Sequence, residues 1–200
     1  ATPAASAGLA RRRASVMGPA LEPLTYRRPL HLVSAQGVWM TDVEGRRYLD
    51  AYNNVPCVGH GHPRVTEAVA RASRRLNTNL RYLHEDAVIL AERLVATLPA
   101  GLDTVFFVNS GSEANDLAWR LATAATGADG GLCTPFAYHG ISAASTALSP
   151  ETWPADRPPA HVATWALPDR HPGGATATPD EEPDTSAMAA ALAALADRGH

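Results

Sequence analysis

The chain has 200 residues, of which 46% are hydrophobic, and a formal net charge of -3 at pH 7. It is long enough to bury a core, and its charge balance gives no support for nucleic-acid binding beyond the local cluster Arg11–Arg13. No apolar run reaches the roughly 18 residues that a membrane helix needs, so we expect a cytoplasmic globular protein without a membrane partner.

All 17 basic residues are arginines, and the sequence contains no lysine. Chemistry that needs a lysine amine to form a Schiff base therefore cannot be completed by these residues alone. The two cysteines, Cys57 and Cys133, lie far apart without a partner motif. We expect both to be reduced, small core residues and not a disulfide or a metal site.

Residues 1–24 are rich in Ala, Pro and Arg without periodicity, which predicts a flexible N-terminal arm. Two β-prone runs, 37–41 and 47–52, flank Asp42–Gly45, and a glycine in this position suits the left-handed residue of a turn. The pattern predicts a hairpin.

Proline and glycine mark the limits of the next elements. Pro63 is placed to open a helix that runs to Leu76, and a second helix is predicted from about Glu85 to Leu98. A β-branched and aromatic run predicts a strand over 104–108. The helix that follows ends at Gly127 and carries a stripe of small apolar residues suited to packing on a sheet: Ala114, Leu117, Ala118, Leu121, Ala122 and Ala125.

The remaining chain continues the alternation of strands and helices. Short strands are predicted at 132–134 and 161–167, long loops at 149–160 and 168–185, and a helix at 186–198. Strands joined by helical crossovers favour an α/β sheet. Because a strand should follow the last helix, we expect this sheet to continue beyond residue 200.

A possible anion site lies where the predicted strand 104–108 runs into Ser110–Glu113, a glycine turn flanked by hydroxyls. The first N–H groups of a helix have no partner within the helix, so such a turn can hold a phosphate. The alternative is a capping box, which stabilises a helix by about 1 kcal/mol and needs no ligand. Asn109 and Asn115 add polar groups that capping does not require, and both roles can coexist.

Two other motifs contain histidine. In Phe136–Gly140 an aromatic ring can lie flat on a planar cofactor, or Tyr138 and His139 are ordinary half-buried loop residues. In Gly59–Pro63 two histidines stand two residues apart without a nearby third ligand, which is a poor zinc set. We interpret this motif as a turn and a helix entry, and predict no metal site.

These motifs carry a family resemblance. Asn109–Asn115, with Tyr138–Gly140 downstream and Gly45–Asp50 and Gly59–Pro63 upstream, resembles the N-terminal half of a class III (omega-type) aminotransferase of the pyridoxal-phosphate fold type I superfamily. The resemblance covers about residues 37–145. It implies an α/β fold in three layers, with a mostly parallel sheet in the large domain.

The resemblance also implies a domain division. Residues 25–62 would form the N-terminal segment of the small domain, and residues 63–200 the first part of the large cofactor-binding domain. The Pro-rich region 149–185 fits the family poorly. Within the class, three segments resemble the branch that contains phospho-lyases of phosphoethanolamine and phosphohydroxylysine beside alanine–glyoxylate-type aminotransferases: Tyr52–Asn54, Leu76–His84 and Ser112–Ala118.

Carried over to this sequence, the family pattern implies pyridoxal 5'-phosphate as cofactor. Its phosphate would be held by Ser110, Gly111 and Ser112, while Tyr138 would stack on its ring and His139 would support the loop. Substrate contacts would come from Asn53, Asn54 and Arg81. The family's cofactor-pairing aspartate and Schiff-base lysine come later than residue 200, so no catalytic residue is expected within this chain.

The expected activity is transfer of an amino group from an amine or amino acid to a keto acid or aldehyde, by a homodimer. Two alternatives stay open. One is a phospho-lyase reaction on a phosphorylated amino alcohol, and the other is a non-catalytic, truncated cofactor-binding or partner subunit.

Overall fold

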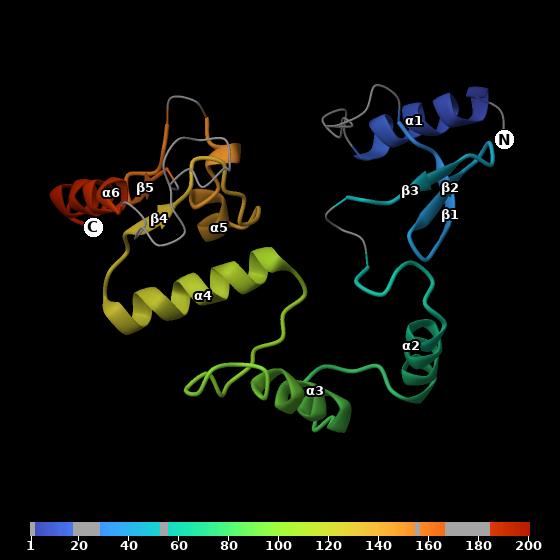
Figure 1. Ribbon diagram of the computed structural model, residues 1–200, viewed down its shortest axis with the longest axis horizontal. Coiled ribbons are helices and arrows are strands. Elements are labelled where there is room, and N and C mark those ends of the chain that lie inside the picture. The colour runs from blue at the N-terminus through green and yellow to red at the C-terminus, as the bar shows by residue number, and fades with distance from the viewer. Residues whose placement is uncertain (1–2, 18–28, 53–55, 155–156, 167–184) are drawn as a thin grey trace, which may run out of the picture. The chain divides into compact units, whose positions relative to one another are not determined.

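The computed structural model describes residues 3–17, 29–52, 56–154, 157–166 and 185–200 (Figure 1). Asn53, Asn54 and nearly all of the predicted loop 168–185 lie outside the described residues. By compactness the chain forms two units, Ala1–Ala87 and Val88–His200. The family-based division at residue 62 concerns the domains of a larger fold and stays a prediction.

The first unit contains a helix, a small sheet and a second helix, and ends within a third. Its elements are α1 (Pro3–Met17), β1 (Leu32–Gln36), β2 (Trp39–Asp42), β3 (Arg47–Leu49), α2 (Pro63–Arg75) and the start of α3 (Glu85–Val95). The second unit holds the rest of α3, α4 (Gly111–Thr126), β4 (Gly131–Cys133), α5 (Ala143–Ala147), the 3-10 turn η1 (Pro150–Thr152), β5 (Val162–Thr164) and α6 (Ser186–Asp197).

The three strands of the first unit form an antiparallel sheet in the order β1-β2-β3. Strands β2 and β3 confirm the predicted hairpin, and Gly45 takes a φ of 82° in its turn. Strand β1 was not predicted, and pairs with β2 from Leu32 opposite Asp42 to Gln36 opposite Trp39. Its sequence lacks the alternation that marks a half-buried strand, and only one of its five residues is even partly covered.

Asp42 is the polar centre of this hairpin, with a side chain only 4% exposed. Its carboxylate accepts hydrogen bonds from the backbone N–H of Glu44 and Arg46, from Arg46 Nε at 2.8 Å and from the Tyr48 hydroxyl at 2.8 Å. Burial alone would raise the pKa of Asp42, but these hydrogen bonds outweigh it and hold that pKa well below its usual range. The ionised carboxylate therefore fixes the turn.

The N-terminal arm contains regular structure that its lack of periodicity does not predict. Residues 3–17 form α1, and Ser6 Oγ makes a 3.0 Å hydrogen bond with His31 Nδ1. Alanine and arginine have the high helix propensities that allow a helix without an apolar stripe.

Both predicted helices that follow the hairpin are confirmed. Helix α2 opens with Pro63 and ends at Arg75, and α3 starts at Glu85 and ends at Val95, three residues before the predicted Leu98. Neither helix buries a residue.

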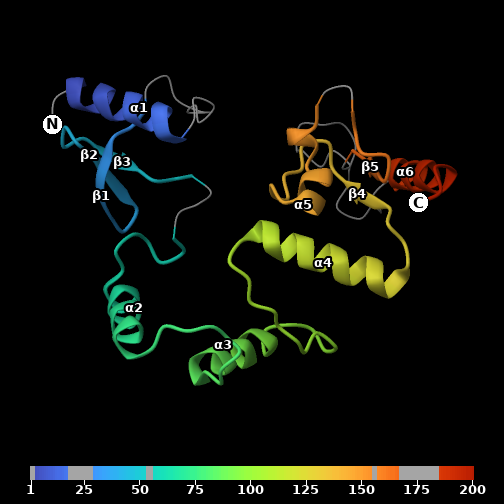
Figure 2. The ribbon, with the colours of Figure 1, turned by 180° about the vertical axis from the view of Figure 1, so that it is seen from behind.

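The second unit contains a parallel strand pair, as predicted. Strands β4 and β5 pair from Gly131 opposite Val162 to Cys133 opposite Thr164, and α6 packs on β5 (Figures 1 and 2). Four buried apolar residues form the core of the described chain: Cys133, Val162, Ala191 and Leu195. Cys133 is thus the core residue that was expected, whereas that expectation is wrong for Cys57, which is exposed and unpaired.

The predicted strand 104–108 is wrong for this structure. These residues form no strand, and Phe106 is 63% exposed. The reason is physical: a strand exists only in a hydrogen-bonded ladder, and no described residue pairs with this run.

Helix α4 has the predicted ends but buries a different face. It begins after Ser110 and ends at Gly127 in a left-handed conformation, as the glycine predicts. The expected apolar stripe is exposed apart from Leu117. The half-buried side instead carries Ser112, Asn115, Asp116, Trp119 and Thr123, and α4 packs on α5, a helix that was not predicted.

The last two regions are partly confirmed. The predicted loop 149–160 includes the short turn η1, and the predicted helix 186–198 is α6.

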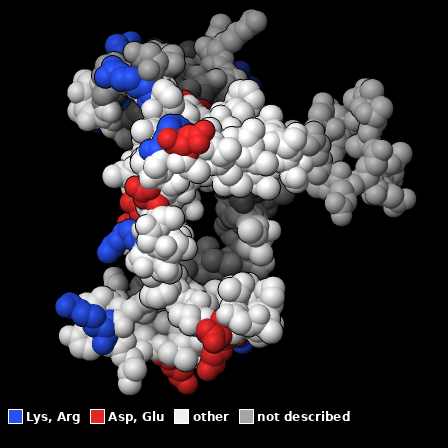
Figure 3. Space-filling model, turned by 90° about the vertical axis from the view of Figure 1, so that its left-hand side faces the viewer, with Lys and Arg blue, Asp and Glu red and all other residues white. Residues whose placement is uncertain are grey.

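Among the described residues no helix is long and apolar enough to cross a bilayer. On the face shown in Figure 3, the charged side chains of the described residues lie in small separate groups of both signs.

Candidate functional site

The start of α4 is a capped helix terminus. The Ser110 hydroxyl accepts a hydrogen bond from the N–H of Glu113 at 3.2 Å, and the Glu113 carboxylate accepts one from the N–H of Asn109 at 2.7 Å. This is the reciprocal arrangement of a capping box, shifted by one residue on the return bond. The capping interpretation is therefore correct for Ser110, whose acceptor side faces its own helix.

Capping leaves two donors of the same turn unused. Within the described parts of the chain, no hydrogen bond uses the backbone N–H of Gly111 or Ser112. A side chain built on Gly111 would meet nothing within 4 Å, so the space beside this turn is open. Two free amides at the positive end of a 16-residue helix, next to open space, fit a phosphate group.

Ser112 adds a third donor at this point. Its hydroxyl oxygen accepts a hydrogen bond from the N–H of Ile141 at 3.2 Å, and its carbonyl accepts one from the Ser142 hydroxyl at 3.2 Å. A serine hydroxyl has one proton and two acceptor positions. Because Ile141 occupies an acceptor position, the proton of Ser112 remains available to an anion.

The structure brings the second motif to the same place. The loop after β4 carries Tyr138 and His139, both exposed, and then Gly140 with a φ of 135°. A side chain at Gly140 would collide with the hydroxyls of Ser112 and Ser145. Only glycine allows this close approach, so the aromatic residues stand beside the start of α4 and are not the half-buried residues of the alternative interpretation.

Five polar residues that hold this loop were not singled out by the sequence as a group: Asn115, Asp116, Ser142, Ser145 and Ser149. Ser145 and Ser149 are completely buried. A signal for part of the set is present in the sequence, since the three serines follow a spacing of i, i+3 and i+7, which puts them on one side of a helical segment.

The structure says little about the three residues predicted to contact the substrate. Asn53 and Asn54 lie outside the described residues. Arg81 belongs to the first unit and is exposed, and its Nε and backbone N–H both donate to Asn79 Oδ1, at 3.2 and 3.1 Å.

Of the two histidines in Gly59–Pro63, His60 has a side-chain partner. His60 Nε2 lies 2.6 Å from Asp50 Oδ2, and the backbone of His60 pairs with Gly37. Among the described residues no group of three or more His, Cys, Asp or Glu side chains is placed to hold a metal ion. The positive φ of Gly59 and Gly61, and the start of α2 at Pro63, agree with the interpretation of the motif as a turn and helix entry.

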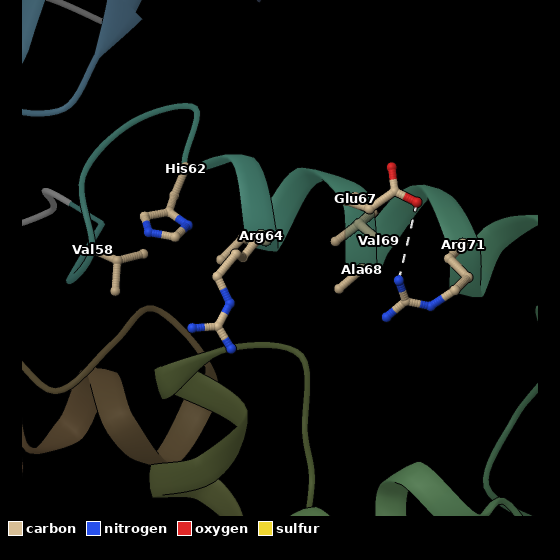
Figure 4. Close-up of a pocket in the computed structure, with 8 residues that line it drawn as sticks. Val58, His62, Arg64, Glu67, Ala68, Val69 and Arg71 are labelled. Atoms are coloured by element: carbon tan, nitrogen blue, oxygen red, sulfur yellow. Dashed lines mark ion pairs between the residues drawn. The ribbon is translucent and has the colours of Figure 1, made fainter.

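A pocket of about 650 Å³ lies along α2 (Figure 4). Its charged lining residues include Glu67 and Arg71, which face each other at 4.0 Å, and it also contains His62, whose Nδ1 is buried without a partner among the described residues. Among the described residues, none of those predicted to bind cofactor or substrate lines this pocket. The candidate site is therefore the start of α4 with its neighbouring loop.

Comparison with known proteins gives the family. The sequence profile described as aminotransferase class-III matches residues 24–172, which is more than half of the chain. The chain belongs to this family. Among curated relatives, the alanine–glyoxylate aminotransferase 2-like protein of Drosophila melanogaster is 47% identical over 128 residues, covering 64% of this chain and 26% of that protein.

A second relative bears a different activity in its name. Ethanolamine-phosphate phospho-lyase homolog 1 of Caenorhabditis elegans is 37% identical over 140 residues, covering 70% of this chain and 30% of that protein. The chain thus spans about 26% and 30% of the length of these two relatives.

Solved structures show the same two activities. A phospholyase from Arthrobacter in complex with phosphoethanolamine matches with a TM-score of 0.83 and 38% identity, over 96% of this chain and 46% of that chain. An (S)-enantioselective omega-transaminase from Thermomicrobium roseum matches with a TM-score of 0.69 and 27% identity, again over 96% and 46%. These matches confirm the α/β fold of the fold type I enzymes for the portion present.

Class III aminotransferases and the related phospho-lyases depend on pyridoxal phosphate. The residues of this chain fit the phosphate end of that cofactor. Among the described residues, the amides of Gly111 and Ser112 have no hydrogen-bond partner, the Ser112 hydroxyl keeps its proton while it accepts from Ile141, and a side chain on Gly111 would meet nothing within 4 Å.

Proposed function

We propose that this chain supplies the phosphate-holding and ring-stacking part of a pyridoxal-phosphate-dependent class III aminotransferase. The protein would transfer an amino group from an amine or amino acid to a keto acid or aldehyde. The observation that carries the proposal is the pair of unused N–H groups at Gly111 and Ser112, beside the loop of Tyr138.

In this role each residue has a defined task. The amides of Gly111 and Ser112 and the Ser112 hydroxyl donate to the phosphate, while Ser110, which also belongs to the predicted phosphate set, caps the helix and keeps the turn in place. The exposed Tyr138 ring covers one face of the cofactor ring, and His139 supports the loop. When bound, pyridoxal phosphate supplies an electron-accepting ring for chemistry at the substrate amine.

The remaining assignments are part of the same proposal. Asn53 and Asn54 would line the substrate pocket, and Arg81 would hold an anionic group of the substrate. The protein would act as a homodimer in the cytoplasm. The family relationship supports the small-molecule amine substrate.

The test is a titration of the purified protein with pyridoxal phosphate, with Ser112→Ala compared to Ser110→Ala. Ser112→Ala should weaken cofactor binding by roughly 1.5–3 kcal/mol, the contribution of a hydrogen bond to a charged group. Ser110→Ala should mainly lower the free energy of unfolding, by about 1 kcal/mol, because it removes the helix cap. Equal cofactor affinity of Ser112→Ala and the wild type, with a loss of stability only, would show that this turn is a cap without a ligand.

A phospho-lyase is the second candidate, because the Arthrobacter phospholyase matches with a higher TM-score and identity than the omega-transaminase from Thermomicrobium roseum. The two activities are separated by the product. The protein translated from the complete reading frame would be incubated with phosphoethanolamine, with and without a keto acid. Release of inorganic phosphate without a keto acid indicates the lyase, whereas a keto-acid-dependent new amino acid indicates the aminotransferase.

A non-catalytic cofactor-binding or partner subunit is the third candidate, and the absence of lysine from these 200 residues favours it for the chain by itself. The DNA beyond codon 200 decides this point. A frame that continues into an aspartate-bearing strand and a lysine-bearing loop supports the enzyme, and a stop codon supports the subunit.

A further inference from the structure

The loop that carries Tyr138 is held at both peptide groups that flank His139. The N–H of His139, from the peptide that joins it to Tyr138, donates to the Ser149 hydroxyl at 2.8 Å. The carbonyl of His139, from the peptide that joins it to Gly140, accepts from Asn115 Nδ2 at 2.6 Å. Two successive peptide planes next to Tyr138 are therefore fixed, although the Tyr138 ring itself is 55% exposed.

The anchor on one side is rigid because it is buried. The Ser149 side chain is completely buried, and its single hydroxyl proton is directed at the carbonyl of Ser145 at 2.6 Å, with the carbonyl of Gly140 as a weaker second acceptor at 3.3 Å. The N–H of Ser145 donates in turn to Asp116 Oδ1 at 3.0 Å. A buried hydroxyl with its hydrogen-bonding positions satisfied has little freedom to move.

The anchor on the other side connects the loop to the candidate phosphate site. Asn115 lies three residues after Ser112 on α4, so both side chains point to the same side of that helix. Ser112 bonds to the N–H of Ile141 and Asn115 bonds to the carbonyl of His139, which puts one bond on each side of Gly140. The distance between the start of α4 and the Tyr138 ring is thereby set by side chains of α4.

Capping and phosphate binding do not account for Asn115. The cap uses Ser110 and Glu113, and the free donors are those of Gly111 and Ser112. Asparagine also has a poorer helix propensity than alanine. The Asn115 side chain instead holds the loop, through its hydrogen bond to the carbonyl of His139.

We infer that Asn115 and Ser149 are positioning residues of the cofactor site: they hold the peptides around His139 and so place the Tyr138 ring at the correct distance from the phosphate-binding turn. This inference rests on the proposed function. It predicts that losing either anchor weakens recognition of the cofactor ring while leaving recognition of phosphate intact.

The test compares two probes, pyridoxal phosphate and inorganic phosphate, on wild type, Asn115→Ala, Asn115→Asp and the control Thr126→Val. Thr126 is also on α4, but in the described part of the chain its hydroxyl bonds only to the carbonyl of Ala122 and the N–H of Ala128, near the far end of the helix. Asn115→Ala should weaken pyridoxal phosphate binding by about tenfold, the upper range for one hydrogen bond, with unchanged affinity for inorganic phosphate. Thr126→Val should bind both probes like the wild type.

Asn115→Asp keeps the size of the side chain but places a carboxylate against the carbonyl of His139. Its affinity for pyridoxal phosphate should therefore fall at least as much as that of Asn115→Ala. Because alanine favours a helix, Asn115→Ala is expected to fold, and its thermal unfolding is recorded alongside. The inference is overturned if Asn115→Ala weakens both probes equally or neither. If the wild type binds neither probe, the proposed function itself fails. If the wild type binds both probes and the Asn115 variants behave like Thr126→Val, the proposed function stands and only this inference fails.

Discussion

Ser110 and Ser112 are two residues apart at the start of α4, yet they bond in different directions. Ser110 accepts from its own helix, and Ser112 accepts from a loop 29 residues further along the chain. The same motif thus contains a residue that stabilises the helix and a residue that links the helix to the loop. The capping box and the proposed phosphate site share this one turn.

The surroundings of Asp42 predict how the stability of the hairpin depends on pH. Its pKa is lower in the folded chain than in the unfolded chain, so its stabilising effect is present above the unfolded value, about 3.9, and is lost as the pH falls toward the folded value. We expect Asp42→Asn to destabilise the hairpin at pH 7 and to have a smaller effect near pH 2. Unfolding followed by amide exchange of β2 at both pH values measures this.

Glu44→Gln is the matched control for that experiment. Glu44 also pairs with Arg46, at 2.9 Å, but its side chain is 36% exposed and accepts none of the turn's backbone hydrogen bonds that Asp42 accepts. Its replacement should change stability little. Equal effects of the two substitutions would contradict the assigned role of Asp42.

At the scale of elements, the sequence predicts correctly those features that depend on a residue's own backbone preference, and not those that depend on a partner far along the chain. Pro63 and Gly127 fix helix ends through their own backbone preferences, and both ends were predicted correctly. The run 104–108 has the composition of a strand, but composition cannot supply a partner. Helix α1 was missed because it depends on propensity and not on periodicity.

The candidate site divides in the same way. The sequence indicates the turn of Ser110–Ser112 and the aromatic loop separately, since each is a local pattern. That Asn115 and Ser149 join the two depends on contacts between residues 10 to 24 positions apart, which no local pattern reports. The prediction that the apolar stripe of α4 packs on a sheet is wrong for the opposite reason. The pattern is present in the sequence, but no sheet formed by the described residues covers it.

A prediction for the run 104–108 follows from its lack of a ladder. Its backbone amides should exchange with deuterium much faster than those of β4 and β5, which are paired. Mass-spectrometric or NMR hydrogen exchange on the purified chain measures both sets in one sample. Protection of 104–108 equal to that of β4 would show that this run pairs in a strand after all.

For the whole molecule, the distribution of apolar surface predicts association. Within the described ranges only four apolar residues are buried, whereas Leu83, Phe106, Phe136 and Ile141 are each more than 60% exposed. Exposed apolar surface, together with a strand-like sequence at 104–108 that pairs with no described residue, favours self-association or aggregation. Size-exclusion chromatography with light scattering should show a mass that rises with concentration. A monodisperse monomer that unfolds cooperatively would contradict this prediction.

The central claim is that the start of α4 recognises the phosphate of pyridoxal phosphate without a lysine. The most direct measurement is a pair of titrations of the 200-residue chain, one with pyridoxal phosphate and one with pyridoxal, which lacks the phosphate. We predict clear preference for the phosphorylated form, loss of that preference in Ser112→Ala, and no borohydride-stable adduct on an internal residue. Equal affinity for the two compounds, or a preference that Ser112→Ala leaves intact, would contradict the account.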